Sequence, residues 1–281
     1  MKVIEIEPGD DLLKKYIECY QLFEIAEPLW VKAISTGTLE CWIKLRGGFR
    51  IFDPKEGRFK PAASSGIFPV GTNGYVFHVP NNTICINIKL SPSVLALSSF
   101  KDLINQWESF NFDQFVGESG TNEFRNLDIS DFENLSSKID AIVKAHNDFE
   151  SIDSRIQSVL TSIIASGNHP PTVKELAFEN HLTIKSLERL IKKVFGMTPK
   201  KLIGILRFGN SIKFLNKTEG HRFIEALKFG YYDQSHFIRE CNKIAEMNPS
   251  DILSELSLNT NDIIISSIEP EKFNEIKNQH L

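Results

Sequence analysis

Two stretches of this 281-residue chain, fifty residues apart, decide how its C-terminal part folds. Ser186–Ile203 reads SLERLIKKVFGMTPKKLI, and His236–Leu253 reads HFIRECNKIAEMNPSDIL. At this offset arginine aligns with arginine, lysine with lysine, methionine with methionine and proline with proline. A fixed offset indicates one supersecondary unit used more than once, and two copies are too few for a solenoid. Two basic helices with the same flanking signals, held a fixed distance apart, could contact a periodic partner at two points. DNA is the obvious candidate for such a partner.

The first copy carries the signals of two short helices joined by a turn. Thr172 and Glu175 have the spacing of a capping box, so one helix begins there. Thr183 supplies the N-cap oxygen of a second helix, predicted over residues 184–195, and Gly196 closes it in the left-handed conformation. The inner stripe of this second helix is Leu187, Leu190, Ile191 and Val194. The unit is therefore predicted to be a helix-turn-helix.

The second copy repeats this design. A supporting helix is expected around residues 223–227, Gly230 makes the turn, and Asp233 caps a helix predicted over 234–245. Its inner stripe is Phe237, Cys241 and Ile244. A long helix over 199–216 would fix the separation of the two units. The major groove accepts one α-helix and recurs on one face of DNA about every 34 Å, so one chain could read two successive segments.

Charge is unevenly distributed along the chain. Residues 172–250 hold 14 Lys and Arg against 8 Asp and Glu, whereas the remainder holds 18 against 28. An acidic protein with one basic module suits nucleic-acid contact by that module alone. A solvated surface without function is the alternative reading of such a patch.

Composition places the protein in the soluble class. Hydrophobic residues make up 41% and charged residues 24%, which is ordinary for a globular protein. We expect no transmembrane helix, because no run of about 18 apolar residues occurs. The acidic N-terminus does not resemble a secretory signal, so a cytoplasmic location is expected. The four cysteines are scattered without zinc spacing, which predicts thiols, no metal site and no cofactor.

The N-terminal half reads as β-structure. Residues 83–90, TICINIKL, alternate with the period of a half-buried strand, and residues 40–45 and 75–79 are further strand candidates. Helical spacing follows over 129–149 and 152–164. The predicted fold is α+β: a β-rich sandwich or barrel-like sensor domain with a helical C-terminal part (1–149), an all-α domain with two helix-turn-helix units joined by a long helix (150–254), and a tail (255–281).

The second copy then becomes recognisable. ALKFGYYDQSHFIRECNKIAEMNPSDI, residues 226–252, resembles the pattern A-x-x-x-G-F-x-D-Q-S-x-F-x-R-x-F-K-x-x-x-G-x-x-P of the AraC/XylS family of bacterial transcription regulators. LERLIKKVFGMTPKKLI with Arg207 in the first copy fits the family as well, and the resemblance covers about residues 155–253. It implies a transcription factor that binds double-stranded DNA and is not an enzyme.

By this resemblance, the outer faces of both predicted recognition helices contact DNA. Base contacts would come from Lys185, Ser186, Arg189, Gln234, Ser235, His236 and Arg239. Phosphate contacts would come from Lys192, Lys193 and Lys243, which lie further along each helix. Arg suits guanine and Gln suits adenine.

Four positions depart from the family pattern. His181 stands where the first turn usually has glycine, and Tyr231 replaces a usual Phe. Cys241 replaces a core Phe, and Glu246 replaces the glycine that closes the second recognition helix. We therefore expect the second unit to be the less rigid of the two.

The N-terminal half is similar to the sensor domains of such regulators, with a tyrosine-containing strand over 16–23 and an IxIKLxP segment over 86–92. The resemblance allows a small-molecule effector of unknown identity and a homodimer. The aromatic candidates for an apolar pocket are Trp30, Trp42, Tyr75 and Phe77, although strand aromatics are more often core. The alternative is an enzyme or small-molecule-binding protein in this half with the helical half as an accessory, but residues 1–125 show no nucleophile elbow, no metal constellation around His78 and no cofactor loop.

Overall fold

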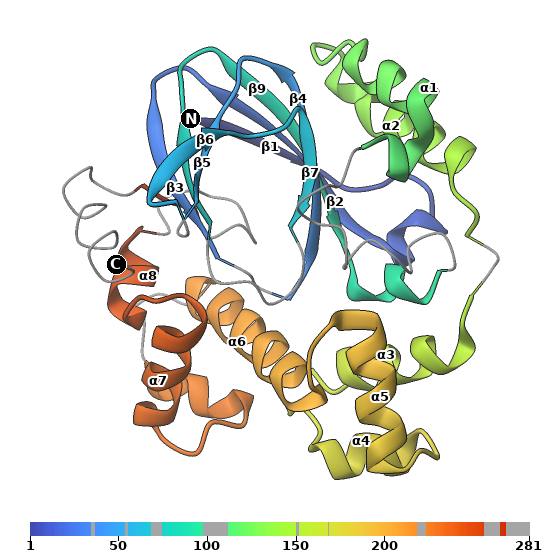
Figure 1. The fold of residues 1–281 in the computed structure, drawn as a ribbon, viewed down its shortest axis with the longest axis vertical. Helices are drawn as coiled ribbons and strands as arrows, with labels where there is room; N and C mark the ends of the chain where they lie inside the picture. The colour runs from blue at the N-terminus through green and yellow to red at the C-terminus, as the bar shows by residue number, and fades with distance from the viewer. Residues whose placement is uncertain are drawn as a thin grey trace.

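The computed structural model describes residues 1–34, 37–53, 56–68, 75–97, 112–149, 152–167, 169–217, 223–255 and 265–267. Two antiparallel sheets form the N-terminal half, and helices form the rest of the described chain (Figure 1). This is the α+β architecture that the sequence predicts.

The first sheet has the strand order β1-β2-β9-β4-β7. Its members are β1 (Lys2–Ile6), β2 (Ile17–Ile25), β9 (Thr83–Leu90), β4 (Leu39–Arg46) and β7 (Ser65–Phe68). A short 3-10 helix, η1 (Leu13–Lys15), joins β1 to β2. Strand β9 pairs with β2 on one side and β4 on the other, which confirms the strand predicted over residues 83–90.

The second sheet has the order β10-β3-β8-β5-β6. Its members are β3 (Leu29–Ala33), β8 (Tyr75–Val79), β5 (Arg50–Asp53), β6 (Arg58–Pro61) and β10 (Ile265–Ser267). Strand β10 comes from the C-terminal tail and pairs with β3, with Ser266 opposite Lys32. The second sheet thus includes residues that follow the two helix-turn-helix units in the chain.

The prediction that residues 83–90 form a half-buried strand is wrong, because β9 is covered on both faces. Ile86 and Ile88 are 1% and 0% exposed in the main core cluster. On the opposite face Cys85 and Asn87 point into the space between the two sheets. Alternation reports which side chains share a face, but not what covers that face.

Two helices cover the isoleucine face of the first sheet, α1 (Asp113–Arg125) and α2 (Phe132–His146) (Figure 1). Asp140 of α2 ties this layer down, because its carboxylate accepts the Tyr20 hydroxyl at 2.6 Å and the Gly9 amide at 2.8 Å. The sequence predicts α2 within 129–149 but gives no signal for α1.

The C-terminal helices follow the order expected for two helix-turn-helix units. They are α3 (Ser154–Ala165), α4 (Val173–Glu179), α5 (Ile184–Phe195), α6 (Pro199–Lys217), η5 (Phe223–Phe229), α7 (Gln234–Ile244) and α8 (Pro249–Glu255). A further 3-10 helix, η2 (Pro92–Ala96), directly follows β9 in the N-terminal half. Helix α6 runs between the two units (Figure 1). The supporting element of the second unit is a 3-10 helix, η5, which corrects the α-helical reading of residues 223–227.

Candidate functional site: two basic helices and an apolar pocket

Helix α5 begins and ends at the residues that the sequence predicts. The Thr183 side chain accepts the Ser186 amide at 3.1 Å, and Gly196 closes the helix at a φ of 66°. Leu187 and Ile191 are buried on the inner face. The exposed residues of the predicted contact set are Lys185, Arg189, Lys192 and Lys193. The Ser186 hydroxyl is half-buried and lies 2.9 Å from the Thr183 hydroxyl, so it is part of the cap.

Helix α7 has the same construction. Asp233 Oδ1 accepts the His236 amide at 2.6 Å, and Phe237 and Cys241 are fully buried on the inner face. The exposed residues of its predicted contact set are Gln234, Ser235, Arg239 and Lys243. His236 is half-buried, with Nδ1 accepting the Tyr232 amide at 3.4 Å. Burial raises the pKa of the Cys241 thiol, so this residue is a neutral core group.

Tyr232 is a surface residue that sequence reasoning missed. It stands directly before the Asp233 cap and is 90% exposed, the most exposed large hydrophobic residue among those described. The sequence contains a signal for this exposure. Tyr232 directly precedes the N-cap of a helix whose N-terminal end is predicted to contact DNA, and a side chain at that end lies away from the core.

A bidentate ion pair fixes α7 to α6. Arg207 Nη2 lies 2.7 Å from Glu240 Oε1, and Arg207 Nε lies 3.1 Å from Glu240 Oε2. The guanidinium also lies 4.6 Å from the centroid of the Tyr231 ring. Both charged side chains are largely buried, at 16% and 13% exposure. The pair therefore positions the second recognition helix from its inner side.

Within the two helix-turn-helix units, non-glycine residues stand at two described positions with positive φ. His181 and Glu246 both have φ of 54°. Glu246 is fifty residues from Gly196, so the two helices end in the same left-handed turn, one with glycine and one without. Both positions, where the pattern that the sequence resembles has glycine, adopt the left-handed conformation in this chain.

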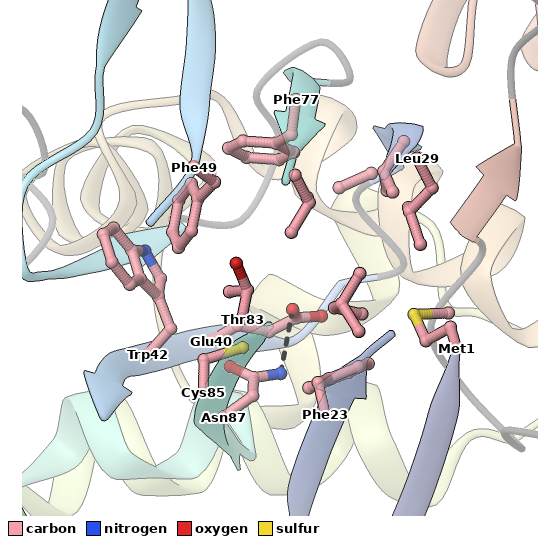
Figure 2. Close-up of a pocket in the computed structure, with 14 residues that line it drawn as sticks. Met1, Phe23, Leu29, Glu40, Trp42, Phe49, Phe77, Thr83, Cys85 and Asn87 are labelled. Atoms are coloured by element: carbon pink, nitrogen blue, oxygen red, sulfur yellow. Dashed lines mark hydrogen bonds between the residues drawn. The ribbon is translucent and has the colours of Figure 1, made fainter. Parts of the chain in front are cut away.

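The second feature is an apolar pocket between the two sheets (Figure 2). The cavity volume is about 100 Å³. It is lined by Met1, Phe23, Ile25, Leu29, Val31, Ala33, Glu40, Trp42, Phe49, Phe77, Val79, Thr83, Cys85 and Asn87. Of the predicted aromatic candidates Trp42 and Phe77 line it, whereas Trp30 packs against Phe59 and His78 outside the pocket. The Tyr75 side chain lies outside the described residues.

The pocket wall offers little reactive chemistry. Burial raises the pKa of the Cys85 thiol to about 12, so it is protonated at neutral pH. The Thr83 hydroxyl is 3.0 Å from the Gly48 carbonyl and 2.9 Å from the Pro80 carbonyl, so it is used in holding the turn. Among the described residues, no group of three or more His, Cys, Asp or Glu side chains gathers in a way that could hold a metal ion.

Strand β3 joins this pocket to the second unit. Val31 lines the pocket, while Lys32 Nζ lies 3.5 Å from Glu246 Oε2 at the end of α7. Just beyond β3, Ile34 is 6% exposed and belongs to the same core cluster as Phe208 and Ile212 of α6. Strand β3 and the residue that follows it therefore contact both the pocket and the second unit.

A close approach of backbone to side chain follows at Gly37, which has a φ of 96°. A Cβ atom there would lie 2.6 Å from Leu206 Cδ2 of α6, so only glycine fits.

Within the described part of the chain, no helix combines the length and the apolar character needed to cross a membrane.

Residues 176–255 match the model of a helix-turn-helix domain. None of the curated proteins matches the chain. Among solved structures, ToxT from Vibrio cholerae O395 is 16% identical, with 85% of this chain and 97% of that chain covered and a TM-score of 0.49. Unsaturated fatty acid-bound wild-type ToxT from Vibrio cholerae strain SCE256 is 10% identical, with 85% and 94% covered and a TM-score of 0.47. The AraC-like transcriptional activator CuxR is 11% identical, with 68% and 79% covered and a TM-score of 0.28. What this chain binds is inferred below from its own residues.

Proposed function

We propose that this protein is a sequence-specific transcription regulator of the AraC type that reads two successive major-groove segments of DNA with α5 and α7. The match of residues 176–255 to a helix-turn-helix domain model supports the proposal. The observation that carries the proposal is that the two helices share the same local structure. Each has a side-chain N-cap, a residue in the left-handed conformation just after its C-terminus and an exposed basic face. One α-helix fills one major groove, so two such helices on either side of α6 suit two grooves.

The exposed cations of the two helices take different roles. Arg189 and Arg239 lie in the N-terminal halves of their helices, where a guanidinium can donate two hydrogen bonds to guanine O6 and N7. Lys185, Gln234 and Ser235 complete the candidate base contacts. Lys192, Lys193 and Lys243 lie further along and are assigned to phosphates, which position the protein without specifying sequence. Ser186 and His236 rank below the arginines, because their polar atoms already bond within the caps.

The N-terminal domain is proposed to regulate DNA binding through strand β3. A ligand that presses on Val31 from within the pocket moves the strand that carries Lys32 and leads into Ile34. Both residues contact the second unit, so the position of α7 depends on the state of the pocket. A ligand shifts such an equilibrium only by its differential affinity for the two arrangements.

The test is binding of the full chain to a genomic fragment library, followed by affinity measurements on the selected sequence at several salt concentrations. Release of counterions from Z phosphates gives a log–log slope of about −0.9Z, so about four to eight contacts produce a steep loss of affinity with salt. Arg189→Ala combined with Arg239→Ala should abolish selection of the sequence. Arg58→Ala is the matched control, because it removes an exposed arginine of β6 in the sensor domain. A flat salt response would contradict the proposal.

A further inference from the structure

A chain of hydrogen bonds at the base of the pocket fixes the orientation of two side-chain amides. Gln21 Nε2 donates to Glu5 Oε2 at 3.1 Å. Asn87 Nδ2 donates to Gln21 Oε1 at 3.1 Å and to Glu40 Oε2 at 3.2 Å, and Figure 2 shows the latter bond. A carboxylate only accepts hydrogen bonds, so the atoms facing Glu5 and Glu40 must be amide nitrogens. The orientation of both amides is therefore set from both ends of the chain.

This orientation leaves an acceptor without a donor. Both Asn87 N–H groups are used, and Asn87 Oδ1 is buried with no hydrogen-bond partner among the described residues. The whole residue is 4% exposed and lines the pocket. A buried acceptor that lacks a donor is costly, and a ligand that supplies the donor recovers that cost.

The charges around the pocket select against an ionic ligand. The Glu40 carboxylate lies at the pocket wall, and Lys89 is directly opposite Glu40 in the register of β4 and β9. Lys89 is fully buried and does not line the pocket. Paired residues share one face of the sheet, so the positive charge of Lys89 counters the attraction of the Glu40 carboxylate for a cationic ligand. An anion entering the pocket would face two acceptors, Glu40 and Asn87 Oδ1, and no Lys, Arg or His side chain is among the lining residues.

The walls favour a flat apolar body. Phe23, Trp42, Phe49 and Phe77 surround the space, with Trp42 and Phe49 together on one side in Figure 2. An apolar cavity of about 150 Å³ holds benzene, so a space of about 100 Å³ suits a ligand no larger than about one small aromatic ring. The pocket is partly open, so a small substituent on that ring can extend toward the mouth.

We propose that the pocket binds a neutral, compact aromatic ligand that carries one O–H or N–H group, and that this group donates a hydrogen bond to Asn87 Oδ1. The proposal rests on the proposed regulatory function, and it names the class of effector that the pocket selects.

The first test compares two probes of equal size by calorimetry on the full chain. p-Cresol carries a hydroxyl where p-xylene carries a methyl group. Transfer from water favours the hydrocarbon, so p-cresol should bind at least as tightly as p-xylene only if the pocket accepts its hydrogen bond. Tighter binding of p-xylene, binding of neither probe, or tighter binding of the anion 4-methylbenzoate would each overturn the proposal.

The second test locates the acceptor. Asn87→Leu removes it at similar side-chain volume, and the affinity ratio of p-cresol to p-xylene should fall about tenfold. Cys85→Ala is the control, because it changes a neighbouring lining residue on β9 and should leave the ratio unchanged. An unchanged ratio in Asn87→Leu would overturn the assignment. If that variant does not fold, the comparison of probes on the unmodified chain still decides whether a donor is required.

DNA affinity measured in the same samples separates this proposal from the proposed function. Loss of the p-cresol preference with intact, salt-sensitive DNA binding would refute the ligand class alone. Absence of DNA binding would refute the regulator itself, whatever the pocket binds.

Discussion

The ammonium group of Lys32 lies 3.5 Å from the carboxylate of Glu246, and this pair joins a strand that forms part of the pocket to the left-handed turn that follows α7. The Lys32 side chain is 1% exposed and that of Glu246 is 24% exposed. A buried ammonium is costly without a compensating anion, so Glu246 stabilises the position of Lys32 as much as Lys32 stabilises that of Glu246. The contact holds the turn after α7 against strand β3 of the second sheet.

Replacement of Lys32 should loosen this connection. Lys32→Met keeps most of the side-chain length and removes the charge. Because Glu246 is partly exposed and can be hydrated, the loss in unfolding free energy should be about 1–2 kcal/mol, below the 3–5 kcal/mol of a fully buried pair. Thermal unfolding and hydrogen exchange along α7 measure the effect. The matched control is Lys2→Met, which breaks the exposed Lys2–Glu24 pair and should change stability little. Equal effects of the two substitutions would refute the connection.

Two substitutions at Glu246 should separate its charge from its backbone strain. Glu246→Gln removes the ion pair but keeps a Cβ at a φ of 54°, whereas Glu246→Gly removes both. Glycine adopts this conformation without the steric cost of about 1 kcal/mol, so the Gly variant should be more stable than the Gln variant by about that amount. Urea unfolding of the two proteins gives the difference. A Gly variant no more stable than the Gln variant would show that the turn is not strained.

The Arg207–Glu240 pair should contribute strongly to the stability of the second unit. Arg207→Ala leaves the Glu240 carboxylate without its partner in a site where both side chains are mostly buried, which should cost about 3–5 kcal/mol. Arg207→Lys keeps the charge but loses the two-pronged geometry and the contact with Tyr231, so it should restore only part of the stability. Chemical denaturation measures both variants, and full restoration by Lys would mean that charge alone is required.

DNA recognition should divide between two residues of α7 that lie one turn apart. Arg239→Ala should relax base preference at one position of the site and cost about 1–3 kcal/mol of binding free energy. Lys243→Ala should weaken binding to all sequences about equally and reduce the salt dependence. Competition assays with a library of single-base variants report both effects. The opposite pattern would show that the register of α7 in the groove is different.

The two recognition helices should differ in how readily they open. Helix α5 ends at a glycine and α7 ends next to Glu246 at the same left-handed turn, and the fully buried Cys241 occupies a position where the family pattern has a larger aromatic. Hydrogen exchange on the DNA-free protein should show faster exchange over Gln234–Ile244 than over Ile184–Phe195. Equal protection would mean that the Arg207–Glu240 and Lys32–Glu246 pairs compensate for the substitutions.

Local signals explain what the sequence could predict. Thr183 and Asp233 act within one turn of their helices, and Gly196 acts at the next residue, so the two helices were predicted to within one residue of their ends. Strand β9 was found from its alternation, but the helices behind it and the pocket before it come from distant parts of the chain. Helix α1 was not predicted from the sequence, because DQFVGESGTNEFR contains two glycines, and one of them has a φ of 71° inside the helix.

The pocket and its connections had no local signal at all. Gln21, Glu40 and Asn87 come from three different strands, and only the register of β2, β9 and β4 brings them together. Lys32 and Glu246 are 214 residues apart in sequence. Such pairs depend on how the sheets and helices pack, which propensity and spacing do not encode. The structure describes only Ile265–Ser267 within the last 26 residues of the tail, and these residues pair with β3.

The pairing of β10 with β3 has a consequence for folding on the ribosome. Strand β3 is the edge of its sheet until Ile265–Ser267 arrives, because β10 is its neighbour on that side. At about 5–20 residues per second, synthesis of the intervening residues takes roughly 10–50 seconds, and domains fold in order from the N-terminus during that time. The nascent sensor domain therefore carries an unpaired strand edge for most of its synthesis, a form that is prone to pair with other chains. Emergence of Ile265–Ser267 from the ribosome is the step that completes the second sheet.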